Sequence, residues 1–189
     1  MAKKTTSRKE KKKVKEWYTV LAPQALNNAQ IGEILGSEPE SVLGRKIEVT
    51  MQELGAGLSK QNYKFIFRIN NVQGLQASTE FIGHALMGGT ARAARKGHAK
   101  IDQVADVTTL DSKRLRLKVM AITERHVCRS LESALRGKIV EKLSEDVSKL
   151  TLDELIKKLM DDSLSTELFN ECRKIEPLRR MDIRASEFL

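Results

Sequence analysis

The stretch RLRLKVMAIT (Arg114–Thr123) has the clearest pattern in this 189-residue chain, because aliphatic and basic side chains alternate along most of it. The two alternating sets are Leu115, Leu117, Val119 and Ala121, and Arg114, Arg116 and Lys118. A period of two places successive side chains on opposite faces of a β-strand. The stretch therefore predicts a strand with one apolar face against a core and one basic face turned away from it.

The pattern changes on the C-terminal side of this strand, where apolar residues recur at four-residue steps. These residues are Val127, Leu131, Leu135, Ile139, Leu143 and Val147. Such spacing predicts a helix. The capping-box sequence Thr151–Glu154 predicts a second helix through Met160, and a third is expected over Ser165–Ile175, where Pro177 ends it. The final segment, Leu178–Leu189, is basic and β-like.

On the N-terminal side, short β-prone runs are separated by turn residues. The runs are Trp17–Leu21, Gly44–Met51, Tyr63–Ile69, Ala77–Ile82 and, with looser alternation, Ile101–Thr109. A short helix over Ala91–Lys96 interrupts them, with Thr90 as its N-cap. Strands at short spacing predict an antiparallel sheet that closes on itself, and strands followed by helices predict an α+β fold. The expected architecture is an antiparallel β-barrel-like core followed by C-terminal helices.

The chain divides by composition into a basic arm, residues 1–16, and one α+β domain, residues 17–189. Within that domain we expect a β-rich part (17–125), a helical part (127–176) and a short C-terminal segment (177–189). The arm carries +6 of the chain's net charge of +9. Its cations are Lys3, Lys4, Arg8, Lys9, Lys11, Lys12, Lys13 and Lys15. Because the arm lacks apolar periodicity and repels itself, we expect it to be disordered in the free protein.

Three further groups of cations lie in the expected domain. They are Arg92, Arg95, Lys96 and Lys100; the strand face Arg114, Arg116 and Lys118; and Arg125 with Arg129. Lys and Arg that neutralise phosphates release condensed counterions, and Arg can hold phosphate oxygens with two nitrogens. Together with the arm, these groups predict an RNA-binding surface. For Trp17 and Tyr18 we expect a role as sheet anchors where the arm leaves the body, so binding should read RNA backbone and shape.

Other function classes find little support in the sequence. His84, His98 and His126 have no metal-binding spacing, and His126 and Cys128 stand two residues apart, so on a helix they would point to different faces. We therefore expect no enzymatic activity, no cofactor, no metal and no small-molecule substrate. A disulfide between Cys128 and Cys172 stays open, although two distant cysteines without a CxxC partner are typical of a reducing compartment. No apolar run is long enough to span a membrane, and the basic start lacks the apolar region of a secretory signal.

Five segments together resemble a known family. They are KEWYTVLAP (Lys15–Pro23), LGRKIEVTMQEL (Leu43–Leu54), YKFIFRINNVQG (Tyr63–Gly74), ADVTTLDSKRLRLKVMAIT (Ala105–Thr123) and IEPLRRMDIRASEFL (Ile175–Leu189). In order and spacing they resemble the S-three-Ae type of small-subunit ribosomal protein, found in archaea and eukaryotes, at the length of the archaeal form. The resemblance implies a non-enzymatic, cytoplasmic protein on the ribosome, with a barrel-like core and C-terminal helices.

The resemblance further implies binding to small-subunit rRNA on the platform of the subunit, near the mRNA exit, in support of translation. Neighbouring small-subunit proteins are expected partners, and mRNA is a candidate one. The segment 141–171 has nine acidic and four basic residues, so we expect it to face solvent or a basic neighbouring protein. A free RNA-binding chaperone or translational regulator would use the same basic surfaces and is the alternative.

Overall fold

The computed structural model of the chain describes residues 15–55, 57, 60–89, 92 and 98–189. Its strands are β1 (Glu16–Leu21), β2 (Gln30–Gly36), β3 (Lys46–Thr50), β4 (Tyr63–Gln73), β5 (Gln76–Leu86), β6 (Lys100–Thr108), β7 (Arg114–Thr123) and β8 (Leu178–Phe188). Its helices are η1 (Gln24–Leu26), α1 (Pro39–Val42), α3 (Arg129–Val147), α4 (Leu152–Asp161) and α5 (Ser163–Cys172). Strands followed by helices confirm the predicted mixture of a sheet and C-terminal helices. The predicted arm disorder and the helix expected over Ala91–Lys96 lie outside the described residues.

The described strands form one open sheet, which corrects the barrel-like expectation. Along the sheet the order is β2-β1-β5-β8-β7-β6. Outside this order, β4 pairs with β5 on one side and with β3 on the other. The first residues of β5 pair with β1, whereas its last residues pair with β8. Because β5 serves different neighbours at its two ends, the sheet extends in two directions instead of closing into a ring.

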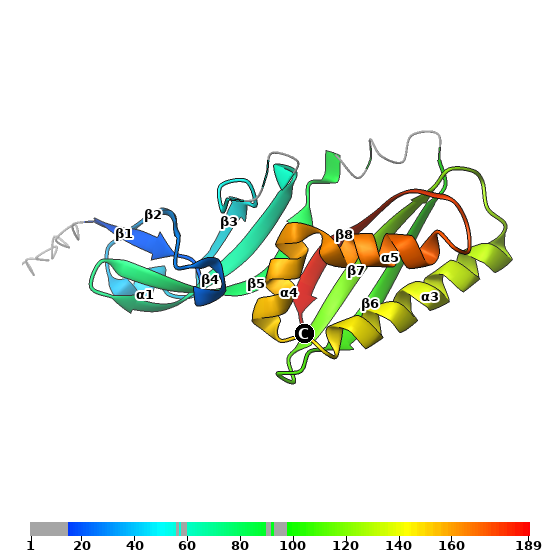
Figure 1. The fold of residues 1–189 in the computed structure, drawn as a ribbon. Coiled ribbons are helices and arrows are strands. Elements are labelled where there is room, and N and C mark those ends of the chain that lie inside the picture. The colour runs from blue at the N-terminus through cyan, green and yellow to red at the C-terminus, as the bar shows by residue number, and fades with distance from the viewer. Residues whose placement is uncertain (1–14, 56, 58–59, 90–91, 93–97) are drawn as a thin grey trace, which may run out of the picture.

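The last strand of the chain, β8, lies between β5 and β7 and is antiparallel to both. It thereby joins the β4–β5 hairpin to the β6–β7 hairpin (Figure 1). The two ladders of β8 connect residues far apart in sequence, such as Gly83 with Glu187 and Leu117 with Ser186. The C-terminal segment predicted to be β-like is therefore the central strand of this half of the sheet.

Helices α3, α4 and α5 lie across one face of β6, β7 and β8 (Figure 1). The predicted stripe of α3 is confirmed where it reaches the sheet, since Leu135, Ile139, Leu143 and Val147 are fully buried. On the facing side of β7, Leu115 and Leu117 are fully buried as well. Burial of each aliphatic side chain of this size stabilises the fold by roughly 1.5–3 kcal/mol, so this contact between helices and sheet is a main stabilising layer.

The capping box of α4 is also confirmed. The Thr151 hydroxyl accepts a hydrogen bond from the Glu154 amide at 3.4 Å, and the Glu154 carboxylate accepts one from the Thr151 amide at 3.0 Å. Helices α4 and α5 are separated by Asp162, whose left-handed backbone (φ 59°) ends α4. Helix α5 covers Ser163–Cys172, slightly N-terminal to the predicted range.

A close backbone approach holds β5 against β8. A Cβ atom added to Gly83 would lie 2.0 Å from the carbonyl oxygen of Ser186. Beside it, His84 is fully enclosed: its Nε2 donates to the Ile183 carbonyl at 2.9 Å, and its Nδ1 lies 2.7 Å from the Ser186 hydroxyl. Burial lowers the pKa of His84 from 6.5 to about 4, so this histidine is neutral in the folded chain at pH 7.

The replacement Gly83→Ala should destabilise the protein by about 1–3 kcal/mol or more, because backbone atoms of β8 must move away from β5. The matched control is Gly137→Ala in α3, where a Cβ would meet no atom within 4 Å. That control should raise the free energy of unfolding by roughly 0.5–1 kcal/mol, as alanine is the better helix former. Urea unfolding followed by circular dichroism measures both, and equal stability of the two variants would contradict the close approach.

Acid should weaken the fold through His84. In the unfolded chain His84 binds a proton below about pH 6.5, whereas in the folded chain it stays neutral down to about pH 4. The free energy of unfolding therefore falls as the pH drops from 6.5 to 4. From pH 7 to pH 5 the loss attributable to His84 should be about 2 kcal/mol. Urea unfolding at the two pH values should show a smaller loss in His84→Gln than in the wild type. The exposed His126→Gln variant is the control, and an equal loss in all three proteins would refute the role of His84.

Candidate nucleic-acid interface

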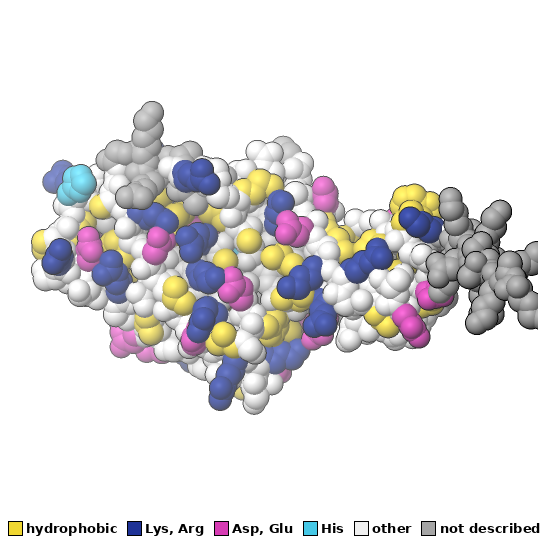
Figure 2. Space-filling model, turned by 180° about the vertical axis from the view of Figure 1, so that it is seen from behind, with side chains coloured by type: hydrophobic (Ala, Val, Ile, Leu, Met, Phe, Trp, Pro, Cys, Tyr) yellow, Lys and Arg dark blue, Asp and Glu magenta, His cyan; other side chains and the backbone are white. Residues whose placement is uncertain are grey.

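The face of the sheet opposite the helices carries the basic side chains of β7. The predicted strand Arg114–Thr123 is confirmed in full, and its alternation buries Leu115 and Leu117 while Arg116 and Lys118 stay partly exposed. Figure 2 shows this face, where Lys and Arg side chains gather over the half of the molecule formed by β6, β7 and β8, with fewer Asp and Glu between them. One of the predicted cation groups is therefore on the surface that the sequence assigned to it.

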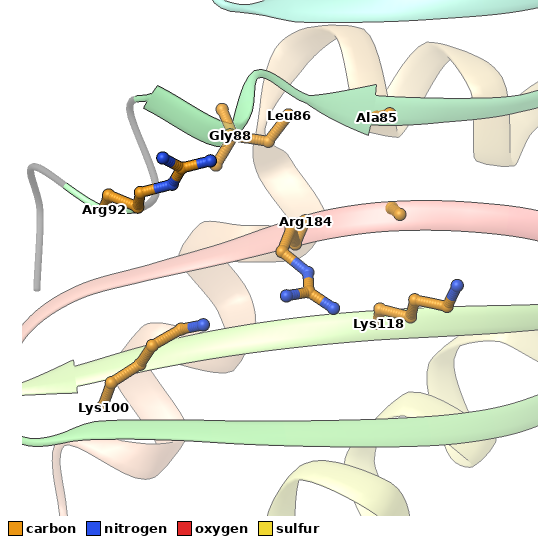
Figure 3. Close-up of a pocket in the computed structure, with 8 residues that line it drawn as sticks. Ala85, Leu86, Gly88, Arg92, Lys100, Lys118 and Arg184 are labelled. Atoms are coloured by element: carbon orange, nitrogen blue, oxygen red, sulfur yellow. The ribbon is translucent and has the colours of Figure 1, made fainter.

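A pocket of about 390 Å³ opens on this face, among four cations (Figure 3). Its lining residues are Ala85, Leu86, Gly88, Arg92, Lys100, Lys118, Arg184 and Ala185. Lys100, Lys118 and Arg184 come from three neighbouring strands, and Arg92 comes from the segment after β5. The Lys100 side chain points toward Arg184, whereas the Lys118 side chain runs away from Arg184 toward its partner Glu187 (Figure 3). Residues from two separate predicted groups, Lys100 with Arg92 and Lys118, thus line one site.

The hollow exists because small residues occupy the seam between β5 and β8. Ala85 and Ala185 are direct cross-strand partners, and neither side chain extends beyond Cβ. Next to them β8 contains one extra residue, Arg184, since Lys118 pairs with Ala185 but Val119 pairs with Ile183. A β-bulge re-aims the side chain it inserts, and here it adds a guanidinium to the rim of the hollow.

Carboxylates on the same face already hold some of the cations. Arg116 binds Asp106 with two nitrogens, Nε to Oδ1 at 2.7 Å and Nη2 to Oδ2 at 2.8 Å. Lys118 pairs with Glu187, and Lys100 pairs with Asp102 at 2.7 Å. The hydrogen bonds from Arg116 lower the pKa of Asp106 and keep its carboxylate charged. The carboxylates of these pairs are exposed to solvent, so the pairs are weak, and a phosphate could compete for the cations at modest cost.

The remaining cations of this face are free for an anion. Among the described residues, Arg92, Arg114 and Arg184 have no carboxylate within ion-pair distance. Arg184 was not among the predicted binding residues, although it belongs to the segment whose basic and β-like character was recognised. Only the position of β8 beside β7 in the folded chain reveals that Arg184 lines the same hollow as Lys118.

The other predicted residues lie apart from the pocket or outside the described residues. Arg125 and Arg129 are exposed, after the end of β7 and at the start of α3, and Lys15 is exposed just before β1. The predicted residues outside the described part are Lys3, Lys4, Arg8, Lys9, Lys11, Lys12, Lys13, Arg95 and Lys96. Tyr18 is buried, as a sheet anchor should be, but Trp17 is 61% exposed, so the anchoring role predicted for Trp17 is wrong.

Residues considered for other chemistry are dispersed. Cys128 is exposed and Cys172 is buried, and both thiols are free, which answers the open question of a disulfide between them. The Cys128 thiol lies 3.1 Å from the Ser130 hydroxyl at the start of α3, and this contact lowers its pKa. The described ranges contain no cluster of three or more His, Cys, Asp or Glu side chains that could hold a metal ion. None of the helices in those ranges is long and apolar enough to cross a bilayer.

Comparison with known proteins identifies the family. Residues 3–189 match the model of the Ribosomal S3Ae family. The chain belongs to this family. S3Ae relatives include the small ribosomal subunit protein eS1 of Methanobrevibacter smithii, 36% identical over 178 residues that cover 94% of this chain and 92% of the relative. The protein of the same name from Methanothrix thermoacetophila is 34% identical over 190 residues, covering 100% of this chain and 90% of the relative.

The pairing pattern on this S3Ae surface predicts unequal contributions of its arginines to RNA binding. Arg184→Ala removes a cation without a carboxylate partner, so it should weaken binding to an RNA duplex several-fold and reduce the slope of log affinity against log salt by about 1. The double variant Arg116→Ala/Asp106→Ala should have a smaller effect, because it removes an ion pair whose net charge is near zero and leaves the local charge unchanged. Filter binding over a salt series measures both, and a larger effect of the double variant would contradict the ranking.

Proposed function

We propose that this chain is a structural constituent of the small ribosomal subunit and binds small-subunit rRNA through its open sheet face and its N-terminal arm. The observation that carries the proposal is the match over nearly the whole chain to archaeal proteins named small ribosomal subunit protein eS1. The cation-rimmed hollow between β5, β8 and β7 supports it, because backbone phosphates are the anions that such a surface fits.

The chemistry of this role is positioning. Arg92 and Arg184 can each hold phosphate oxygens with two nitrogens, whereas Lys100 and Lys118 act as point charges that must first leave their carboxylate partners. An array of fixed cations on a rigid sheet reads the spacing of phosphates in a folded RNA and carries no base information directly. The arm adds +6 of charge by sequence and extends the contact beyond the sheet.

The opposite face of the molecule is suited to a different neighbour. Helices α3, α4 and α5 cover the sheet there, and the segment 141–171 has nine acidic and four basic residues. Acidic helices repel phosphate, so we place this layer toward solvent or toward a basic protein of the subunit.

By the same resemblance we place the protein on the platform of the subunit, near the mRNA exit, with mRNA as a candidate contact. The role is structural and non-enzymatic, in the cytoplasm.

Deletion of residues 2–15 tests the arm. If the arm provides about six phosphate contacts, its loss should reduce the salt slope of binding to a small-subunit rRNA fragment by about 4 to 5, at 0.7–0.9 per contact. The far-ultraviolet circular dichroism spectrum should stay that of the full chain, since β1 begins at Glu16. A slope equal to that of the full chain would remove the arm from the interface.

Association with the ribosome separates this role from that of a free chaperone or regulator. A structural constituent should sediment with small subunits through a gradient at high salt, because many contacts hold it at once. A chaperone or regulator should stay at the top of the same gradient while it still binds isolated rRNA. Release of the chain at high salt would therefore favour the alternative.

A further inference from the structure

Among the residues that the structure describes, Trp17 is the one aromatic side chain that is mostly exposed to solvent. It is 61% exposed in β1, whereas Tyr18, Tyr63, Phe65, Phe67 and Phe81 are each 5% exposed or less. A large aromatic ring left in water forgoes the stabilisation that burial would give it. An exposed tryptophan next to a basic segment is therefore a candidate for contact with a partner.

The surroundings of Trp17 form a small platform with basic groups at two sides. Its direct cross-strand partner is Leu35 of β2, which is 36% exposed. The guanidinium of Arg45 lies beside this pair, since its Nη1 donates to the Leu35 carbonyl at 3.1 Å. Lys15 precedes the platform in the chain, as does the basic arm. Glu33 belongs to the same strand as Leu35, so the charge of the immediate surroundings is mixed and the ring itself is the main feature.

We propose that Trp17 is a stacking platform for an unpaired base of RNA. This inference rests on the proposed function, and it adds a second kind of contact to it. Base faces stack on indole rings in any sequence, and the described cations Lys15 and Arg45 can hold the adjoining phosphates, as in other single-strand binding surfaces. A base is favoured over an apolar protein partner because cations flank Trp17 and the partly exposed Leu35, at Lys15 on the chain and at Arg45 beside the Leu35 carbonyl.

The experiment uses the tryptophan as its own reporter, because the 189-residue chain contains one tryptophan. A short oligouridine and an RNA duplex of equal length are titrated into the purified protein while tryptophan emission and affinity are recorded. Stacking should quench the emission with oligouridine and leave it nearly unchanged with the duplex. Trp17→Ala should weaken oligouridine binding about 5- to 150-fold, the range of one base stacked on an aromatic ring, and Trp17→Phe should retain most of the affinity.

The controls separate this inference from the proposed function. Leu110→Ala removes another exposed apolar side chain, 64% exposed between β6 and β7, and should not alter oligouridine binding. The salt slope should be the same in Trp17→Ala and the wild type, since no charge is removed. Normal oligouridine binding by Trp17→Ala with unquenched emission in the wild type overturns the stacking platform and leaves rRNA binding intact. If Trp17→Ala binds oligouridine normally but is lost from small subunits at high salt, Trp17 contacts a protein and the stacking platform is overturned. If the wild type binds no RNA, the proposed function itself is overturned.

Discussion

The insertion of β8 between β5 and β7 is the constraint on which the rest of the structure depends. It requires the backbones of β5 and β8 to approach at Gly83, where any side chain would collide with the Ser186 carbonyl. It also buries His84 of β5, which makes hydrogen bonds to Ile183 and Ser186 of β8, so a polar contact stabilises the same pair of strands. Without this pairing the two hairpins would have no common sheet, and the helices would have no continuous surface to cover.

The same seam creates the candidate binding surface. Ala85 and Ala185 leave a hollow on the side away from the helices, and the bulge at Arg184 turns a guanidinium toward it. The pairing of β5 with β8 therefore contributes to the packed core on one face of the sheet and to the candidate binding surface on the other. This part of the surface is rigid, because Lys100, Lys118 and Arg184 each belong to a strand whose other face is packed in the core.

Local patterns in the sequence correctly predicted the features that depend on neighbouring residues. The alternation of β7, the stripe of α3 and the capping box of α4 each depend on residues within a few positions, and all three are confirmed. The barrel-like closure was wrong because it concerned pairing between distant strands, and no nearby residue records that β8 pairs with β5. Arg184 was missed for the same reason. Trp17 and Tyr18 could not both be anchors, because neighbouring residues of a strand face opposite sides and only Tyr18 enters the core.

Electrostatic detail depended on register as well. Asp106 and Glu187 stand directly opposite Arg116 in the ladders, so a strand face that is purely basic in sequence lies between carboxylates in the folded sheet. The free cations of this strand face are therefore fewer than the sequence indicated, and two unpaired arginines, Arg92 and Arg184, line the hollow. The net positive charge of the chain indicates the class of partner, but the fold decides which side chains can meet it.

Chemical cross-linking of lysines to RNA in purified small subunits, with the linked peptides identified by mass spectrometry, tests whether the open sheet face meets the rRNA. Lys100 and Lys118 on that face should be linked to rRNA, whereas Lys149 and Lys157 on the helical side should not. Links from Lys149 and Lys157, with Lys100 and Lys118 left unmodified, would place the RNA on the opposite face and refute binding by the open sheet.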